Sequence, residues 1–509
     1  MAMSNYDISE QITEYKDELE EHASDGGLWH AELGNILADL DKPFESVNDW
    51  LDVAHRASML STIFTAGLQN NKAFRDEFES IETLQWKTLN TPPVDDALQD
   101  SLVDKLYIHN PQPGDKISIT VGDYSKYVGE KLVERALKDG VTFQFGVSDT
   151  NFSRLVLKHV DEDGLDRMAA KAIEASEGLT KRISSIPIMP DYDLIDMDKD
   201  KQIAYSQKTK SISERVSSGD IFFTLTKIPS RKDAEIDGQD YDDYVKLFFE
   251  MCDQPWDHID KAHRKLISLL NDTKELRFRN DDGTDLTMEL TDSEGKDFTF
   301  ANSLIAKNVP GSEVFSAPRK DSLNGTIVAK GQFNYFPGKI ITNLTLHFKD
   351  GHLDSFEADD GAEHFQDFLD RHPGNRYTGE IGIGTNPHLK QHVLNSLLVE
   401  KIGGSFHVAL GHPYTMTEYM GEAVYLNNGN NETPDHWDVT TMLYGKGGSI
   451  EADGEIIMEN GRFVDPDLAV LNEGWAAVPV SERPEYWKDF TGYDRSTGKP
   501  SFGAPKPAP

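Results

Sequence analysis

The segment TPDHWDVTTMLYG, residues 433–445, places an imidazole and a carboxylate two positions apart, at His436 and Asp438. Because side chains at i and i+2 of a strand point to the same face, a strand here would project these two side chains together. Trp437 and Val439 would then face the other way, into a core. Such a pair can be half of a metal site or an ordinary hydrogen-bonded pair, and the triplet alone favours the second interpretation.

Other acidic and imidazole residues occur in short apolar segments bounded by turns. They are Glu313 in NVPGSEVFSAPRKDSLNG, Glu380 in GEIGIGTNP, and Glu400 and His407 in LLVEKIGGSFHVALGHPY, which also contains Tyr414. Each has an ordinary interpretation, because a lone Glu on a strand is usually solvated and a His or Tyr among apolar residues is usually hydrogen-bonded in a core. Burying a charge costs several kcal/mol unless it is paired or binds a metal, so the recurrence favours a shared site.

Glu, His and Asp together form a set of oxygen and nitrogen ligands. This set suits two divalent ions bridged by a carboxylate, with Zn, Co or Mn as the expected metals. Two such ions about 3.5–4 Å apart can polarise a carbonyl group and lower the pKa of a bound water to about 7. The chemistry indicated by these residues is hydrolysis.

In order and spacing, four segments resemble successive signature segments of the M29 family of metallo-aminopeptidases: NVPGSEVFSAP, GEIGIGTNP, EKIGGSFHVALGHPY and HWD. NDDGTDLTMEL resembles the GTDL hairpin of that family, and PQPGDKISITVGDYSKYVGEKLVERALKDGV resembles its N-terminal α/β segment. The resemblance covers residues 106–490 and leaves out the helical segment before them. It implies a metal-dependent exopeptidase that releases N-terminal amino acids from peptides with a free N-terminus.

The resemblance also implies the residues of the site. The implied metal ligands are Glu313, Glu380, Glu400, His407, His436 and Asp438, and the implied catalytic residues are Tyr414 and Glu400. Glu380 is expected to bridge both ions, Glu400 has general base as its other role, and Tyr414 is expected to donate to the oxyanion. Ser312 stands where the family has Gly, and Val399 stands where it has Asp.

The implied mechanism uses two divalent ions that hold the free α-amine and the scissile carbonyl oxygen. A metal-bound hydroxide attacks the carbonyl, Tyr414 supports the oxyanion, and a carboxylate passes a proton to the leaving amine. The family also implies a homodimer with an enclosed active site. Residues 1–105 would then form a dimer contact or a gate over the cavity.

Two alternatives remain open at this point. Another dinuclear hydrolase, such as a phosphoesterase, would need basic residues near the ions, and Arg319 and Lys320 follow Glu313 closely. A non-catalytic member of the same fold would bind metal or peptide without turnover. The helical extension and the two departures at Ser312 and Val399 favour that second alternative.

The composition restricts the class of protein. With 51 Lys and Arg against 88 Asp and Glu, the net charge is −37, so neither a nucleic acid nor an anionic membrane is expected as a partner. The single cysteine, Cys252, excludes an intramolecular disulfide and a thiolate zinc cluster. No signal peptide is recognisable, and no apolar run approaches the about 20 residues of a membrane span. We therefore expect a cytoplasmic protein, and the acidic composition also fits a salty cytoplasm.

At 509 residues the chain is expected to form two or three domains. Apolar residues at helical spacing predict a helical N-terminal extension over residues 1–105. Alternating strands and helices predict an α/β domain over residues 106–270, beginning with a short strand in LYIHN. Residues 271–509 combine alternating strands, Asp-Gly turns and a helix, which predicts a mixed, β-rich, metal-binding catalytic domain. The expected fold class is therefore multidomain, α+β and α/β.

Overall fold

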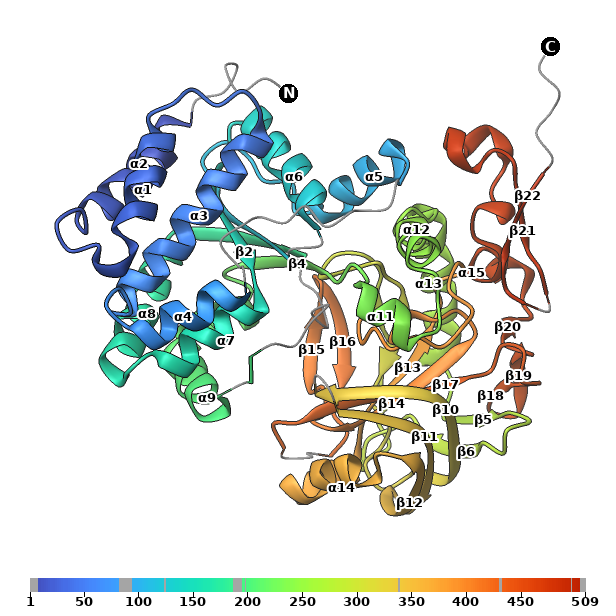
Figure 1. The fold of residues 1–509 in the computed structure, drawn as a ribbon. Helices are drawn as coiled ribbons and strands as arrows, with labels where there is room; N and C mark the ends of the chain where they lie inside the picture. Colours follow the sequence, from blue (N-terminus) through green and yellow to red (C-terminus); the bar gives the residue numbers. More distant parts are fainter. Residues whose placement is uncertain are drawn as a thin grey trace. The chain divides into compact units, whose positions relative to one another are not determined.

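The computed structural model describes residues 8–81, 94–122, 125–185, 195–196, 198–336, 339–429, 433–495 and 497–503. The chain divides into two compact units, Met1–Lys232 and Asp233–Pro509 (Figure 1). Helices and sheets are mixed in the chain, as expected. The predicted division into three domains, with boundaries at 105 and 270, stays a prediction.

The first unit is built on a parallel sheet with the strand order β2-β1-β3-β4. The strands are β1 (Lys116–Gly122), β2 (Thr142–Ser148), β3 (Leu179–Ser185) and β4 (Phe222–Thr226). The helices that follow strands are α6 (Lys126–Asp139), α7 (Thr150–His159), α8 (Glu162–Ala175), α9 (Lys199–Lys208) and α10 (Lys210–Ser217). Helix α6 ends at Gly140, which has a φ of 67° and can adopt this left-handed conformation without a side-chain clash. The predicted strand–helix–strand pattern is confirmed.

Helices precede this sheet in the chain, as the sequence predicted. They are α1 (Ser9–Glu20), α2 (His30–Leu40), α3 (Val47–Thr65), α4 (Lys72–Ile81) and α5 (Asp96–Leu106). Helix α3 begins with a capping box between Ser46 and Asp49 and contacts β2, α6 and α8. The N-terminal helices therefore belong to the same compact unit as the sheet. The short strand predicted in LYIHN is wrong, because α5 continues through Leu106 and a turn follows it.

Among the described residues, the second unit contains two large antiparallel sheets and two two-stranded sheets. The larger has the strand order β12-β11-β10-β6-β5-β18-β19-β20 and the smaller has the order β17-β14-β13-β9-β7. The larger sheet consists of β5 (Glu275–Arg279), β6 (Asp285–Glu289), β10 (Asn324–Phe336), β11 (Lys339–Lys349), β12 (His352–Asp360), β18 (Ser449–Ala452), β19 (Glu455–Glu459) and β20 (Arg462–Phe463). The smaller consists of β7 (Ala301–Ser303), β9 (Glu313–Ser316), β13 (Thr378–Gly384), β14 (Ser405–Gly411) and β17 (His436–Met442). The predicted Asp-Gly turn at Gly283 joins β5 to β6, and the one at Gly351 joins β11 to β12.

The two large sheets share one hydrophobic core with helices α13 (Trp256–Asn271) and α14 (Ala362–Arg371). Helix α12 (Tyr241–Cys252) precedes them in the chain. Phe278 of β5 stacks on Phe406 of β14, with ring centroids 4.2 Å apart. Trp437 of β17 packs on Phe365 and Phe368 of α14, at 5.2 and 5.3 Å. The predicted core position of Trp437 is confirmed, and the smaller sheet is held against the core by one face.

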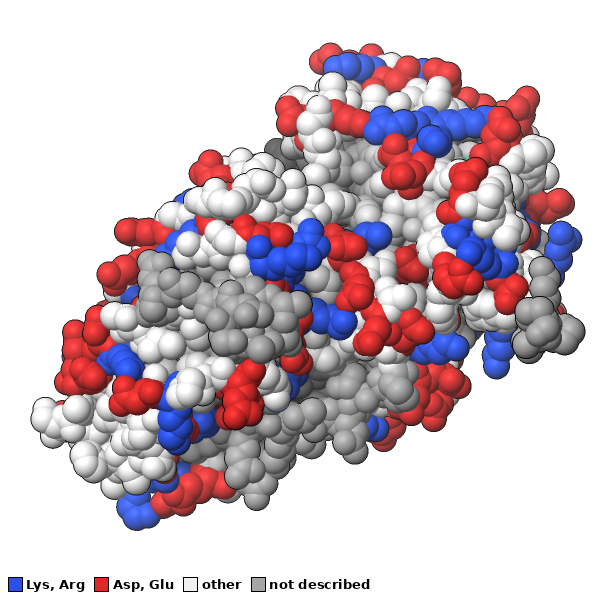
Figure 2. Space-filling view, turned by 90° about the horizontal axis from the view of Figure 1, so that it is seen from above, with Lys and Arg blue, Asp and Glu red and all other residues white. Residues whose placement is uncertain are grey.

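Acidic side chains are spread over the visible face of the molecule, with Lys and Arg side chains among them (Figure 2). The negative charge is therefore distributed along the chain instead of being confined to one segment. Among the described helices, none is long and apolar enough to cross a membrane.

Candidate metal centre

One face of the smaller sheet collects the predicted site residues. In the strand register, Glu380 and Asp438 both lie opposite Ala409, and His407 lies opposite Gly382. Because cross-strand partners share a face, this face carries the side chains of Glu313, Glu380, His407, His436 and Asp438. The residues between them, among them Val314, Ile381, Val408, Trp437 and Val439, lie in the core. The sheet therefore separates an apolar face from a face of ionisable groups.

Glycines in GEIGIG make room on the ionisable face. A Cβ atom at Gly382 would lie 2.2 Å from the imidazole ring of His407. A Cβ atom at Gly384 would lie 2.3 Å from the carbonyl oxygen of Ile402. Contacts this short do not occur between real atoms, so only glycine lets the His407 ring lie across β13 toward Glu313 and Glu380.

His436, Asp438 and Glu380 form the first half of the cluster. One ligand atom from each lies within 4.8 Å of the others. The Nε2 atom of His436 lies 3.1 Å from Glu380 Oε2 and 3.6 Å from Asp438 Oδ2. The Nδ1 atom of His436 donates to the carbonyl oxygen of His412 at 3.0 Å, which leaves Nε2 as the nitrogen that faces the carboxylates. The predicted projection of His436 and Asp438 to one side is confirmed.

His407 connects this half to Glu313. Its Nε2 atom lies 3.8 Å from Glu380 Oε1 and 3.6 Å from Glu313 Oε2. All three side chains are buried. His407 and Glu380 therefore lie between the two ends of the cluster, with His436 at one end and Glu313 at the other.

Lys401 was not predicted as part of the site. Its side chain is fully buried, and its Nζ atom lies 2.5 Å from Glu313 Oε1 and 2.9 Å from Glu400 Oε2. Glu400 and Lys401 lie in the short helical turn Val399–Lys401, outside the sheet. The Glu-Lys pair in the apolar segment LLVEKIGG was a signal, because a lysine there needs a partner when buried.

Tyr414 lies beside the cluster. Its ring centroid is 5.2 Å from that of His436 and 5.4 Å from that of Phe315. The negative charge of Glu380, together with burial, raises the pKa of Tyr414 above its ordinary value. The hydroxyl group therefore stays protonated and can act as a hydrogen-bond donor near Glu380.

The close packing of charges shifts the pKa values of the cluster. Burial lowers the pKa of His436 and His407, but the carboxylates around them outweigh burial and raise these values to about 10 and about 9. Burial, followed by the charge of Glu400, raises the pKa of Asp438 to about 8. Burial raises the pKa of Glu380, but its pairing with His407 and His436 outweighs this and lowers the pKa to about 2. Without a metal ion, the charge of Lys401 and the protons on the imidazoles balance the carboxylates of the cluster.

Several buried ligand atoms fit a metal ion. Glu313 Oε2 and Asp438 Oδ1 have no hydrogen-bond partner among the described residues. Leaving such atoms unpaired is costly, and a divalent ion would satisfy them. Carboxylate oxygens and imidazole nitrogens are the donors that Zn, Co and Mn accept. The donor set, its burial and the orientation of His436 therefore fit a site for divalent metal.

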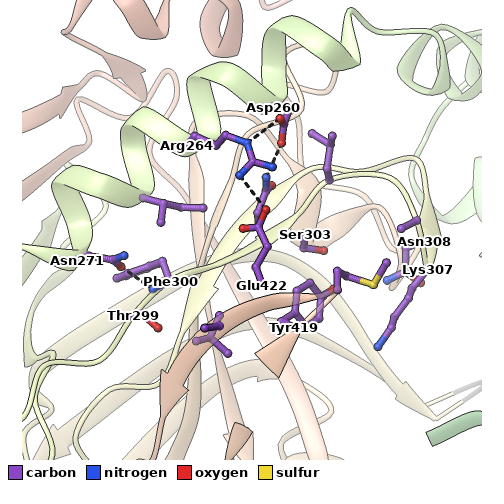
Figure 3. Close-up of a pocket in the computed structure, with 17 residues that line it drawn as sticks. Asp260, Arg264, Asn271, Thr299, Phe300, Ser303, Lys307, Asn308, Tyr419 and Glu422 are labelled. Carbon is purple, nitrogen blue, oxygen red and sulfur yellow. Dashed lines mark hydrogen bonds and ion pairs between the residues drawn. The ribbon is translucent and has the colours of Figure 1, made fainter. Parts of the chain in front are cut away.

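A cavity of about 300 Å³ lies beside the edge strand of this sheet. Ser303 of β7 lines the cavity and is the cross-strand neighbour of Glu313. The other walls come from helix α13 and from the hairpin of β15 (Met416–Tyr419) and β16 (Glu422–Leu426) (Figure 3). Arg264 of α13 reaches Glu422 of the hairpin at 2.8 Å. The cavity therefore borders β7, the strand that pairs with the strand carrying Glu313.

The residues that supported the alternative interpretations have other contacts. Arg319 pairs with Glu289 and Asp321. The ammonium group of Lys320 lies 4.7 Å from the ring centroid of Tyr377. Both cations are therefore engaged in contacts within the protein. This weakens the phosphoesterase interpretation, which needs them for binding phosphate.

The two positions that depart from the family pattern are both buried. The Ser312 hydroxyl lies 2.7 Å from that of Thr385, which contacts His263 Nε2 at 2.8 Å. The carbonyl oxygen of Val399 accepts a hydrogen bond from Thr440 at 3.2 Å. Both positions are integrated into the fold and leave the ionisable face intact.

The sequence is similar to those of known proteins. The model of the family described as thermophilic metalloprotease (M29) matches residues 102–463. Aminopeptidase 2 of Geobacillus stearothermophilus is 36% identical over 111 residues, which is 21% of this chain and 26% of that protein. Aminopeptidase AmpS of Bacillus subtilis is 28% identical over 229 residues, which is 41% of this chain and 54% of that protein. These matches span less than two thirds of either relative.

Longer matches come from Thermus. Aminopeptidase T of Thermus thermophilus is 24% identical over 366 residues, which is 65% of this chain and 86% of that protein. The solved structure of wild-type AmpT from Thermus thermophilus superposes with a TM-score of 0.59 at 22% identity, over 73% of this chain and 100% of that one. The fold is therefore shared. Since the family model covers most of the chain, this protein belongs to the M29 family of thermophilic metalloproteases.

Proposed function

We propose that this protein is an aminopeptidase that uses two divalent metal ions to release the N-terminal amino acid of peptides with a free N-terminus. The observation that carries the proposal is the group of buried ligand atoms on one sheet face, including the unpartnered Glu313 Oε2 and Asp438 Oδ1. Membership in a metalloprotease family and relatives named aminopeptidases support the same activity.

The residues have distinct roles in this proposal. Ligands for two ions come from Glu313, Glu380, Glu400, His407, His436 and Asp438. Glu380 lies near both imidazoles, which supports a role for it in holding both ions. When bound, the ions supply Lewis acidity and a hydroxide nucleophile.

Tyr414 and Glu400 complete the proposed chemistry. The Tyr414 hydroxyl donates to the oxygen that becomes negative when the carbonyl is attacked. Glu400 is less enclosed than the other carboxylates, with 22% of its side chain exposed. It is therefore the carboxylate best placed to pass a proton between water and the leaving amine, in addition to or in place of binding a metal.

The test is release of free amino acids from matched peptides. The protein is stripped with a chelator, then given Zn, Co, Mn or Mg, and offered each peptide with a free or an acetylated N-terminus. We expect cleavage of the free peptides only, and only with metal. Cleavage of acetylated peptides would contradict exopeptidase action, and metal binding without cleavage would favour the non-catalytic alternative.

The resemblance also underlies a proposed homodimer. Sedimentation of the full chain would test it, because a dimer has twice the mass of 57.1 kDa. Deletion of residues 1–105 would test whether the N-terminal helices contribute to assembly. Unchanged assembly and unchanged preference for peptide length would contradict a role for these helices as a dimer contact or a gate.

A further inference from the structure

Lys401 is a cation built into the interior of the site. Its side chain is fully buried, and it contacts the carboxylates of Glu313 and Glu400 at 2.5 and 2.9 Å. A buried ammonium group is tolerated only when well-placed anions compensate its lost hydration. Glu313 and Glu400 provide this compensation from two elements that lie far apart in the sequence.

The rest of the cluster has no such permanent cation, because a bound metal ion displaces the protons of His407 and His436. Glu380, His436 and Asp438 bring one ligand atom each to within 4.8 Å of one another. The protein atoms at their centre are carboxylate oxygens and the Nε2 atom of His436. The two halves of the site therefore differ in charge, since a positive protein group already occupies the half at Glu313.

We propose that Lys401 makes the two metal positions unequal. An ion held by Glu380, His436 and Asp438 binds tightly, whereas an ion that uses Glu313 and Glu400 binds against the positive charge of Lys401 and exchanges readily. This inference rests on the proposed two-ion site. Two positive charges a few ångströms apart in a buried site repel strongly enough to change affinity by more than about tenfold.

The net charge of the site depends on how many ions are bound, and this dependence gives the unequal metal positions a catalytic role. Glu313, Glu380, Glu400 and Asp438 carry four negative charges, and Lys401 offsets one of them. One divalent ion leaves the site negative overall, whereas two give it one excess positive charge. Only the fully loaded site would therefore favour the negative oxygen that develops during peptide cleavage. Lys401 acts here as a positioning and charge-setting residue through the ions and carboxylates.

The test measures metal binding instead of turnover. Chelator-treated full-length protein is titrated with Co²⁺, and the two dissociation constants are obtained from calorimetry and from the visible absorption of bound Co²⁺. The variants are Lys401→Met, which removes the charge, and Lys401→Arg, which retains it. The matched control is Lys390→Met, because Lys390 is also buried in this unit but contacts the Gly403 carbonyl oxygen at 3.4 Å.

In the unaltered protein we expect two Co²⁺-binding steps, with the second ion bound more weakly than the first. Lys401→Met should tighten the second step by about tenfold or more and leave the first within a few-fold. Lys401→Arg and Lys390→Met should keep the two steps apart. A weaker second step in Lys401→Met, or a single step in the unaltered protein, would overturn the inference.

Peptide cleavage separates this inference from the proposed function. Cleavage of unblocked peptides by a protein that binds one ion would leave an aminopeptidase but overturn the unequal sites. Two unequal steps that respond to Lys401→Met, without cleavage under any metal, would support the inference and contradict the enzyme. Thermal melts of each variant show whether the loss of a metal-binding step reflects unfolding. If Lys401→Met is unfolded, the binding steps of Lys401→Arg are compared with those of the unaltered protein.

Discussion

The Nδ1 atom of His436 donates to the carbonyl oxygen of His412, and its Nε2 atom faces Glu380 at 3.1 Å. The backbone thereby fixes both the tautomer and the direction of the ring. His436 is therefore oriented before any ion binds.

His436→Ala should abolish the tight metal position. Losing a residue that only orients a ligand costs about 10–100-fold in metal affinity, so losing the ligand itself should cost more. Metal content after dialysis, measured by mass spectrometry, checks this. His352→Ala is the control, since His352 is partly exposed and contacts Asp354 outside the cluster. Full metal content in His436→Ala would remove His436 from the ligand set.

Tyr414→Phe should reduce turnover without loss of metal. The ring of Tyr414 lies beside that of His436. Its hydroxyl is expected to donate only when the carbonyl oxygen becomes negative, and removing one such donor costs about 10²–10³ in kcat. Steady-state kinetics with an unblocked peptide measure kcat and KM separately. KM should stay within a few-fold. An unchanged kcat would assign Tyr414 to packing against Phe315.

The metal-free protein should lose stability as the pH rises from 7 to 10. The pKa values of His407 and His436 are raised to about 9 and about 10, above their ordinary 6.5. Their charged forms therefore stabilise the fold fully below pH 6.5, and this contribution is lost as the pH rises through the folded-state values. The raised pKa of Asp438 acts in the same direction.

Urea unfolding of chelator-treated protein across this pH range measures the effect. Protein loaded with Zn or Co is the control, because a bound ion replaces the imidazolium charge and should flatten the dependence. A midpoint that rises with pH in the metal-free protein would contradict this account.

Gly382→Ala should disrupt the metal centre, because the new methyl group would displace the His407 ring. The added Cβ would lie 2.2 Å from the His407 ring, so the ring or the strand must shift. Such overpacking typically costs about 1–3 kcal/mol of stability, and the second metal equivalent should be lost with it. Gly146→Ala is the matched control, since Gly146 also lies in a strand but has no atom within 4 Å of its added Cβ among the described residues. Equal behaviour of the two variants would contradict the role given to Gly382.

Trp437→Ala should destabilise the second unit strongly. The indole packs on Phe365 and Phe368 between the two ligand positions of β17. Truncating a buried Trp typically costs about 3–5 kcal/mol. Urea unfolding followed by circular dichroism measures this cost. Trp437→Phe should reduce the free energy of unfolding much less. Equal reductions in the two variants would contradict the view that the volume of the side chain at this position stabilises the unit.

The sequence predicted those parts of the site that depend on local periodicity. Alternation along a strand was enough to place His436 and Asp438 on one face and Trp437 in the core. The pairing of Lys401 with Glu313 could not be predicted in the same way, because 88 residues separate them and only the tertiary fold brings them together. The first strand of the α/β segment was misplaced because Leu106, apolar in either structure, ends a helix begun at Asp96, and Tyr107 follows as its C-cap.

The alternation in β13, β14 and β17 also bears on how this sequence can change over evolutionary time. A substitution on the core face alters packing and leaves the ionisable face in place. Inserting or deleting one residue within a strand would exchange every position beyond it between the two faces, so that His407 would trade places with Val408. Insertions and deletions among relatives should therefore occur in the connecting loops, while the strands should change only by substitution.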